Sequence, residues 1–411
     1  MTAGKSPQLG RQFAWASTAR VIAAILQAIL LIVAARAVSS AEFGLLASVL
    51  GVATVVQTAL DMGVSTFVTR ERAASPDSGS VATALRFNAL TSVIMALLAG
   101  TLILWAGTFN VSFLFLLPLA IWVSAERTAD LRLAIAFADG DVRVNSLNLL
   151  ARRLTSIVLL VALLYLAVEP LLAYSIAVAL AAVASAIFAN AYVRKRVVTR
   201  SDISFRKLIR MSWPYWLHSV ATQARNLDSA IVALVAGSTQ AGYFSVASRL
   251  TSPLRILPTS LESVLLPNAA RAGTSGMRPL ARLAAIATLI CVGVYAVVFA
   301  ATPWALPVLL GDAYAGSVPA VMIVVAGLPF AAAGSLHSSL LLGAGHKHFV
   351  ATVSVCSSLL CLLAVAAFGF VWGAIGAAGA LSGTFAVQAL AILTGYYILV
   401  HIRSTRNGDA L

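Results

Sequence analysis

The sequence predicts an all-α polytopic membrane protein with twelve transmembrane helices in two pseudo-symmetric six-helix bundles and both termini in the cytoplasm. Three observations predict this fold. Of the 411 residues, 60% are hydrophobic and only 10% are charged, whereas a soluble domain is about 25% charged. Twelve stretches reach the roughly 20 mostly apolar residues that a membrane span needs. The basic residues between these stretches fall almost entirely on one side.

The densest charge lies at the middle of the chain. Residues 194–210 carry seven of the 28 basic residues and a single acid, Asp202. Short loops rich in Lys and Arg stay in the cytoplasm, so this segment sets the orientation. We therefore expect an N-terminal six-helix bundle at 1–193, a basic cytoplasmic linker at 194–208 and a C-terminal six-helix bundle at 209–411.

The apolar stretches follow one another with short connections. The first stretch precedes Ala35-Arg36-Ala37, which resembles a signal-peptide cleavage site, but it is long enough to span and Arg20 interrupts it, so we expect it to be retained. Pro303 and Pro307 predict that the helix of the ninth stretch ends in a tight turn between them. The predicted spans are residues 13–36, 43–67, 81–107, 112–137, 144–168, 171–193, 209–236, 241–268, 280–303, 317–342, 348–370 and 373–400.

The charge distribution tests this order of helices. With residues 194–210 inside, the cytoplasmic segments and their helix-end flanks hold eighteen basic residues, and the outer loops hold one, Arg36. A missed span would reverse the side of every later loop and destroy the asymmetry. The net charge of +14 would suggest nucleic acid in a soluble protein, but the orientation rule accounts for it here, and we expect no nucleic-acid partner.

Several site chemistries are excluded by the motifs. The three cysteines, Cys291, Cys356 and Cys361, lie in apolar runs and form no CxxC pattern, so we predict neither disulfides nor a metal site. No GxGxxG or GxxxxGK[ST] occurs, which argues against a nucleotide-binding domain. The sequence therefore predicts no cofactor.

Arginines inside the predicted spans are the most unusual feature. Each costs roughly 2.5–3.5 kcal/mol at the bilayer centre, so nine facing lipid would cost on the order of 20–30 kcal/mol, more than the roughly 5–15 kcal/mol that stabilises a domain. Most must face protein or water, or lie near a helix end. These arginines are Arg20, Arg86, Arg127, Arg132, Arg152, Arg153, Arg225, Arg249 and Arg255.

Depth divides these arginines at about 1.5 Å per residue. Arg86 and Arg132 lie close enough to the cytoplasmic end to extend to water, and the adjacent Arg152 and Arg153 point in different directions. Deep cations from both halves suggest a shared cationic cavity. The near-midplane residues are Arg20, Arg127, Arg152, Arg153 and Arg249, with Arg225 toward the outer side and Arg255 toward the inner side.

Local pairing is the alternative explanation for the deep arginines. Arg127 with Asp130, and Arg225 with Asp228, are i,i+3 neighbours that can neutralise each other on a helix. Arg20 and Arg249 have no acid one turn away, so they are the best candidates for binding an anion. Guanidinium groups suit phosphate because they bind it in a bidentate manner and stay charged.

An internal repeat links the two halves. Phe43-Gly44-Leu45 opens the second span and Ala241-Gly242-Tyr243 opens the eighth, and the two glycines are 198 residues apart. Each motif follows an apolar helix and a short polar stretch. A six-plus-six parallel duplication places an axis along the membrane normal and a site between the halves.

The motifs together resemble a known family. The chain is similar to Wzx-type O-antigen flippases of polysaccharide biosynthesis, in the multidrug/oligosaccharidyl-lipid/polysaccharide exporter superfamily, over nearly its whole length. Trp213-Pro214-Tyr215-Trp216 departs from the small aliphatic residues more usual there. The motifs that carry the resemblance are Ala41-Glu42-Phe43-Gly44-Leu45, Asp61-Met62-Gly63, Arg70-Glu71, Asp228, residues 241–250, Leu266-Pro267, Leu310-Gly311-Asp312-Ala313-Tyr314 and residues 373–378.

The resemblance implies a transporter, not an enzyme. It implies a flippase of the inner (cytoplasmic) membrane that carries a polyprenyl-diphosphate-linked oligosaccharide outward by alternating access. Its implied partners are that lipid, the surrounding membrane lipids and downstream polymerase or glycan-export proteins. The substrate-binding candidates are Arg20, Arg127, Arg249, Arg255, Arg225 and Arg152, and the gating or coupling candidates are Asp61, Asp130 and Asp228.

Three other interpretations remain open at this point. A cation-coupled multidrug exporter of the same superfamily would need acids and aromatic residues in its cavity, yet the deep charges are mainly arginines. A membrane glycosyltransferase or polymerase acting on the same lipid would place acids or a metal motif on a large loop, and every loop here is short. A scaffold without transport would leave the deep arginines without a purpose.

For Asp61 alone, a salt bridge with Arg70 or Arg72 is the alternative to a gating role.

Overall fold

The described part of the chain is almost entirely helical. In a computed structural model, the described residues are 6–74, 79–197, 203–256, 258–259, 261–262, 265, 269 and 277–402. No strand occurs among these residues, and nine of their helices are long and apolar enough to cross a membrane. The predicted class, an all-α multi-pass membrane protein, is confirmed, whereas the number twelve and the side on which the termini lie stay predictions.

The helices divide into two compact units. The first contains residues 1–42 and 49–226, and the second contains Phe43–Ser48 and residues 227–411. One helix, α2, therefore contributes residues to both units. The domain boundaries predicted at residues 193 and 209 stay a prediction. In the observed division, the whole of α8 belongs to the first unit.

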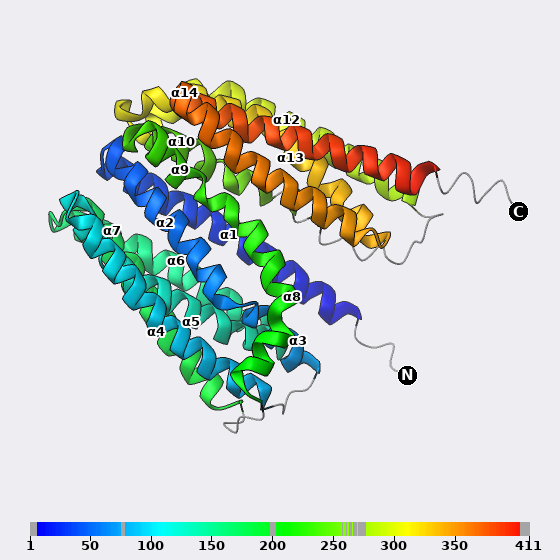
Figure 1. Ribbon diagram of the computed structural model, residues 1–411, viewed down its shortest axis with the longest axis horizontal. Helices are drawn as coiled ribbons and strands as arrows, with labels where there is room; N and C mark the ends of the chain where they lie inside the picture. The colour runs from blue at the N-terminus through cyan, green and yellow to red at the C-terminus, as the bar shows by residue number, and fades with distance from the viewer. Residues whose placement is uncertain are drawn as a thin grey trace, which may run out of the picture. The chain divides into compact units, whose positions relative to one another are not determined.

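The first unit is a bundle in which α5 contacts α3, α4, α6 and α7, and α1 lies along α6 (Figure 1). Its core holds apolar residues of five helices, among them Val64 and Phe67 of α3, Phe87 of α4 and Leu131 of α5. The elements of this unit are α1 (Ser6–Ala37), α2 (Ser40–Asp61), α3 (Val64–Ala74), α4 (Ser80–Gly107), η1 (Val111–Leu116), α5 (Leu119–Ala138), α6 (Val142–Tyr165), α7 (Pro170–Arg194), α8 (Phe205–Gln223) and η2 (Ala224–Leu227).

The second unit is built around α13 and α14, which pack along each other, with α12 against α13 and α9 and α10 against α14. Its core includes Leu336 and Leu340 of α13 and Ile392 of α14. The elements are α9 (Asp228–Ala236), α10 (Ser238–Leu250), η3 (Ser252–Arg255), α12 (Met277–Leu310), η4 (Asp312–Ser317), α13 (Val318–Gly343), α14 (Lys347–Tyr396) and η5 (Tyr397–Ile402).

Several predicted spans are interrupted helices. The stretch 43–67 ends as a helix at Asp61, because Met62 (φ 51°) and Gly63 (φ 74°) adopt left-handed conformations before α3 begins. The stretch 209–236 contains a 3₁₀ turn, η2, between α8 and α9. In the stretch 241–268, α10 stops at Leu250 and Pro253 lies in the 3₁₀ turn η3, as expected for a residue that has no N–H to donate.

Two other predicted helix ends differ. The expected exit at Pro303 and Pro307 is wrong, because both prolines lie inside α12, which continues to Leu310; membrane helices tolerate proline where neighbouring groups satisfy the freed carbonyls. The stretches 348–370 and 373–400 form α14, which kinks where Trp372 and Gly373 leave helical geometry. The backbone N–H of Ala374, just past the kink, donates to Gln240 Oε1 of α10 at 2.9 Å.

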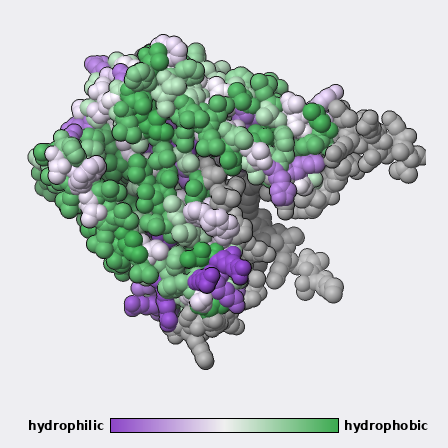
Figure 2. Space-filling view, in the orientation of Figure 1, coloured by the Kyte–Doolittle hydropathy of each residue, from purple (hydrophilic) through white to green (hydrophobic). Residues whose placement is uncertain are grey.

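The surface is apolar where the bundle would meet lipid. Large exposed side chains on α4 include Leu90, Val93, Ile94 and Leu97. On the face seen in Figure 2, hydrophobic residues cover the middle of the first unit's helices, and hydrophilic residues gather at their lower ends. This is the distribution that a bilayer selects, with apolar side chains in hydrocarbon and polar ones at the interface.

The repeated glycine motif makes a helix contact. A Cβ at Gly44 of α2 would lie 2.5 Å from the backbone nitrogen of Gly242 in α10, and closer still to the Ser238 carbonyl oxygen. Only glycine allows two backbones to approach so closely. Gly44 and Gly242 are the residues that the repeat aligns, so the two copies of one motif lie against each other within the second unit.

We expect Gly44→Ala to destabilise the protein, because the added methyl group meets backbone atoms that cannot move aside. Overpacking of this kind costs about 1–3 kcal/mol. A lower midpoint of thermal unfolding in detergent would show it. Gly379→Ala is the matched control, since Gly379 also lies inside a helix and its Cβ would have no neighbour within 4 Å. Equal midpoints for the two variants would contradict the close contact.

Candidate functional site

The end of α2 is a sharp turn that Asp61 stabilises. Asp61 is the last residue of α2, and its carboxylate accepts hydrogen bonds from the Ser65 backbone N–H at 3.2 Å and the Ser65 hydroxyl at 2.7 Å. It thus satisfies one of the free N–H groups of the first turn of α3, as a capping side chain does. The turn fixes where this carboxylate points.

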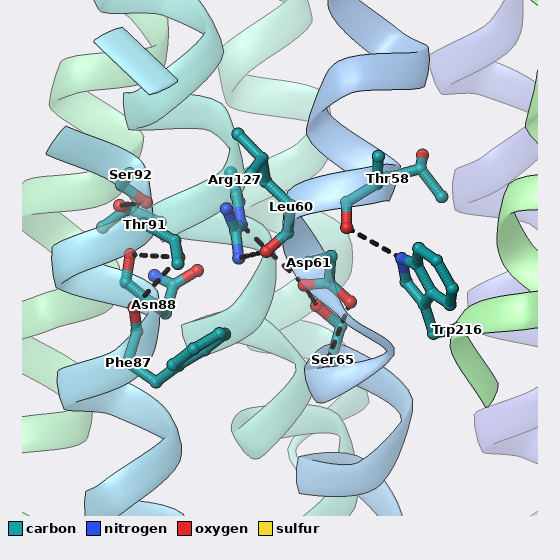
Figure 3. Close-up of polar contacts among 12 residues, drawn as sticks. Thr58, Leu60, Asp61, Ser65, Phe87, Asn88, Thr91, Ser92, Arg127 and Trp216 are labelled. Atoms are coloured by element: carbon teal, nitrogen blue, oxygen red, sulfur yellow. Dashed lines mark hydrogen bonds and ion pairs between the residues drawn. The ribbon is translucent and has the colours of Figure 1, made fainter. Parts of the chain in front are cut away.

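Arg127 of α5 lies against this end of α2 (Figure 3). Its side chain is 3% exposed, its Nη2 donates to the Leu60 carbonyl oxygen at 2.9 Å, and its Nε lies 3.8 Å from Asp61 Oδ1. The last carbonyls of a helix have no partner within the helix and carry its partial negative charge. Arg127 is therefore neutralised by both a carboxylate and a helix C-terminus.

Two pairings considered as alternatives, Arg127 with Asp130 and Asp61 with Arg72, are not the ion pairs that the described residues form. Arg72 instead binds Asp139, with its Nε 2.7 Å and its Nη2 3.2 Å from the two carboxylate oxygens. The side chain of Arg70 lies outside the described residues. The i,i+3 rule considers one helix alone, and here packing between helices decides the pairs.

A buried polar cluster lines α4 in the same region (Figure 3). Asn88 is fully buried, and within the described part of the chain neither atom of its amide has a hydrogen-bond partner. Thr91 donates to the Phe87 carbonyl at 2.9 Å, and Thr128 of α5 donates to Ser92 at 3.3 Å. An unsatisfied buried amide costs about 1–3 kcal/mol, so Asn88 is poised to bond a polar group that enters.

Helix α8 packs over the α2–α3 turn. Trp216 Nε1 donates to the Ala59 carbonyl at 2.7 Å, and a Cβ at Gly63 would lie 2.5 Å from the Ser212 carbonyl oxygen. The unusual Trp213-Pro214-Tyr215-Trp216 sequence thus supplies a hydrogen bond to the end of α2. Four helices, α2, α3, α5 and α8, meet at this turn.

A second ion-pair network joins α5 and α6. Arg152 is 5% exposed, with Nη2 2.9 Å from Asp130 Oδ1 and Nη1 3.6 Å from Glu126 Oε1. Arg153 reaches the same Glu126 oxygen at 3.4 Å. Adjacent arginines were expected to diverge, but both side chains are long enough to converge on one facing carboxylate. Glu126 was missed in the sequence, although an acid beside Arg127 in an apolar span was the available signal.

The remaining candidates of the first unit have different surroundings. Arg20 of α1 is exposed, and no acid of the described residues lies within ion-pair distance. Arg225 is half-buried in the 3₁₀ turn η2. Among the described residues of this unit, Arg20 is thus a candidate without an acid at ion-pair distance.

In the second unit, Arg249 and Arg255 each contact a neutral group and also interact electrostatically with an acid, Asp228 for Arg249 and Glu262 for Arg255. Arg249 Nη2 donates to the Ala47 carbonyl of α2 at 2.8 Å, and the guanidinium of Arg255 lies 5.4 Å from the centroid of the Phe385 ring. Asp228, the first residue of α9, accepts from the Ser229 backbone N–H at 2.5 Å. An acid at a helix N-terminus is stabilised by the helix dipole.

Comparison with known proteins identifies the family. Residues 9–273 match the model of the polysaccharide biosynthesis protein family. The chain belongs to this family. No curated protein matches.

Solved structures of membrane transporters share the fold of this family member. The lipid II flippase MurJ, in an inward closed conformation, has a TM-score of 0.74 at 14% identity, over 92% of this chain and 87% of that one. An outward-facing multidrug resistance MATE transporter of the MOP superfamily has a TM-score of 0.62 at 16% sequence identity, over 96% of each chain. A MOP superfamily transporter from Pyrococcus furiosus has a TM-score of 0.60 at 15% identity, over 95% of each chain.

We expect Arg127→Met to destabilise the protein strongly, because it leaves the Asp61 carboxylate beside the carbonyl end of α2 without a cation. Breaking a buried pair costs on the order of 3–5 kcal/mol. Chemical unfolding in detergent measures the loss, and the double variant with Asp61→Asn should lose less than the sum of the two single variants.

Arg196→Gln is the matched control for this pair. Arg196 Nη2 also lies 3.8 Å from a carboxylate, that of Asp141, but the two side chains are 42% and 47% exposed. An exposed pair contributes about 1 kcal/mol or less. Strictly additive losses for Arg127→Met and Asp61→Asn, or an equal loss in Arg196→Gln, would contradict a coupled buried pair.

Proposed function

We propose that this protein is a flippase that moves a polyprenyl-diphosphate-linked oligosaccharide from the cytoplasmic to the outer leaflet of the inner membrane, for cell-surface polysaccharide synthesis. The observation that carries the proposal is the match of residues 9–273 to the polysaccharide biosynthesis family. Nine helices of the described residues that are long and apolar enough to cross a membrane, and the fold shared with a lipid II flippase, support a transport role in that pathway.

The distribution of cations suits a diphosphate head group. Arg20 is exposed on α1 with no acid of the described residues within ion-pair distance, and Arg249 donates to a backbone carbonyl and interacts electrostatically with Asp228. Guanidinium groups bind phosphate oxygens in a bidentate manner. In this proposal Arg20 and Arg249 are the principal substrate ligands, and Arg225 and Arg255 assist them.

Arg127 and Arg152 have a different place in the proposal. Both are bound to acids, Arg127 to Asp61 and Arg152 to Asp130 and Glu126. A substrate phosphate could recruit them only by replacing a carboxylate. Their pairs, with Asp61 and Asp130 as the gating residues, would then open and close during alternating access.

The membrane potential can drive such export. Moving one negative charge out of a cell that is negative inside is favoured by roughly 2.3 kcal/mol per 100 mV. A diphosphate carries more than one charge, so in this proposal the potential drives outward movement without ATP. Counter-transport of an ion would be an added drive, with Asp228 as the coupling candidate in the second unit.

A cation-coupled drug exporter is the less favoured alternative. Such a protein needs acids that a cationic drug can reach, yet Asp61 and Asp130 each have an arginine partner and Asp228 accepts bonds from Ser229. The deep arginines would repel a cationic drug. The described charges thus favour an anionic substrate.

We expect cells that lack this protein, but have an intact downstream sugar pathway, to accumulate complete lipid-linked oligosaccharides on the cytoplasmic face. A membrane-impermeant sugar-modifying reagent reports the leaflet. The wild-type gene should restore exposure to the outside, whereas Arg20→Ala and Arg249→Ala should not, because the head group loses its cationic ligands. Arg206→Ala, at an exposed position near the start of α8, should restore exposure fully and is the control.

Two other results would change the proposal. Full rescue by Arg20→Ala and Arg249→Ala, at equal protein levels, would keep the flippase and remove these arginines from its site. An unchanged amount and leaflet of the lipid-linked sugars in cells without the protein would refute the flippase itself, and accumulation of cationic drugs would then be measured.

A further inference from the structure

A second cationic site lies on the side of the first unit. A cavity of 330 Å³ is bounded by α4, α5, α7 and the residues that follow α7. Three arginines line it, Arg86 of α4, Arg132 of α5 and Arg194 of α7, together with Asn190. Among the described residues, no acid lines the cavity. The sequence suggested only that Arg86 and Arg132 extend individually to water, whereas the fold brings three arginines around one cavity.

The central arginine of this cavity is held in place. Arg132 Nε donates to Asn190 Oδ1 at 3.3 Å, and its Nη1 donates to the Thr128 carbonyl at 3.2 Å. Within the described residues no acceptor contacts its Nη2. Arg194 acts on Arg132 as a like charge, and an anion bound between them would relieve this repulsion through charge-assisted hydrogen bonds. The geometry around Arg132 therefore suits an anion.

The cavity lies at the end of a lipid-facing surface. On α4, Arg86 lies on the same helix face as Leu90, Val93 and Leu97, because residues spaced by three and four share a face. These three apolar side chains are 51%, 59% and 66% exposed. On α7, Arg194 is two turns from Ile187, which is 66% exposed. An anion in this cavity would therefore border apolar surface on two helices.

We propose that this cavity binds a phosphate group, and that its source is the head group of an anionic membrane phospholipid. Basic pockets between membrane helices on the cytoplasmic side bind anionic head groups, and residue 194 begins the basic segment that sets the predicted orientation. The acyl chains would lie along the exposed stripe of α4. Inorganic phosphate shares the head group's chemistry but gains nothing from that stripe. The proposal does not rest on the transport function.

The test measures lipid binding to the purified full-length protein by native mass spectrometry. Dioleoyl phosphatidylglycerol should bind more tightly than dioleoyl phosphatidylcholine, which has the same chains but no net charge. Arg132→Gln should weaken phosphatidylglycerol binding on the order of tenfold, the effect of one charge-assisted hydrogen bond, and leave phosphatidylcholine unchanged. Arg132→Lys should recover part of the affinity, because it keeps the charge but loses the fixed donor geometry.

Variants at exposed positions distinguish a loss of lipid binding from misfolding of the protein. Arg86→Gln and Arg194→Gln change side chains that are exposed, so both proteins should unfold at the wild-type temperature and still bind less phosphatidylglycerol. Arg206→Gln removes an exposed arginine that is not part of the cavity and should bind as wild type does. Unchanged phosphatidylglycerol affinity in all three cavity variants, or equal affinity of the wild type for the two lipids, would overturn the proposal.

Inorganic phosphate distinguishes the two sources. If a lipid is the ligand, millimolar phosphate should leave phosphatidylglycerol bound, because the ion does not replace the contacts of the acyl chains. Binding of inorganic phosphate that depends on Arg132, with no preference between the two lipids, would assign the cavity to the free ion and overturn the lipid source.

Discussion

The packing of the first unit depends on how the charge of Arg127 is neutralised. Its guanidinium is buried between the Leu60 carbonyl and the Asp61 carboxylate, and both groups are accessible only because α2 ends there. The left-handed Met62 and Gly63 stop the helix. The same stop creates the first turn of α3, which Asp61 caps, and the surface on which α8 packs. A change at this turn would therefore reach four helices together.

The deep arginines have three kinds of partner in this structure. Acids from neighbouring helices hold Arg127, Arg152 and Arg153. Arg249 contacts a carbonyl and Arg255 an aromatic ring, and each also interacts with an acid, Asp228 and Glu262 respectively. Each arrangement reduces the large penalty of a charge in hydrocarbon, but to a different degree.

The sequence predicted the apolar spans well and the breaks in them poorly. The prediction of a span averages over about 20 residues, so it tolerates errors at single positions. Nine helices of the described residues are accordingly long and apolar enough to cross a membrane. A break such as Met62-Gly63 occupies two residues and barely changes that average. Pro303 and Pro307 caused the opposite error. They predicted a helix end inside the continuous helix α12, because a proline in a membrane helix need not end it.

Site residues were predicted by type but not by partner. Depth and charge drew attention to Arg127, Arg152, Asp61 and Asp130, and the structure does place them in ion pairs. A single sequence shows only the pairs within one helix, so Arg127 with Asp61 and Arg152 with Asp130 could not be found. Which faces meet is decided by the rotation of each helix in the bundle. The cavity with Arg86, Arg132 and Arg194 was hidden for the same reason.

The contact between Gly44 and Gly242 has a consequence for biosynthesis. The two glycines are 198 residues apart, and α2 completes the second unit with Phe43–Ser48. At about 5–20 residues per second, the ribosome needs about 10–40 s to make α10 after α2 has entered the membrane. During that interval the small-residue surface of Gly44 has no native partner. The nascent chain must keep it from other helices until the second copy of the motif arrives.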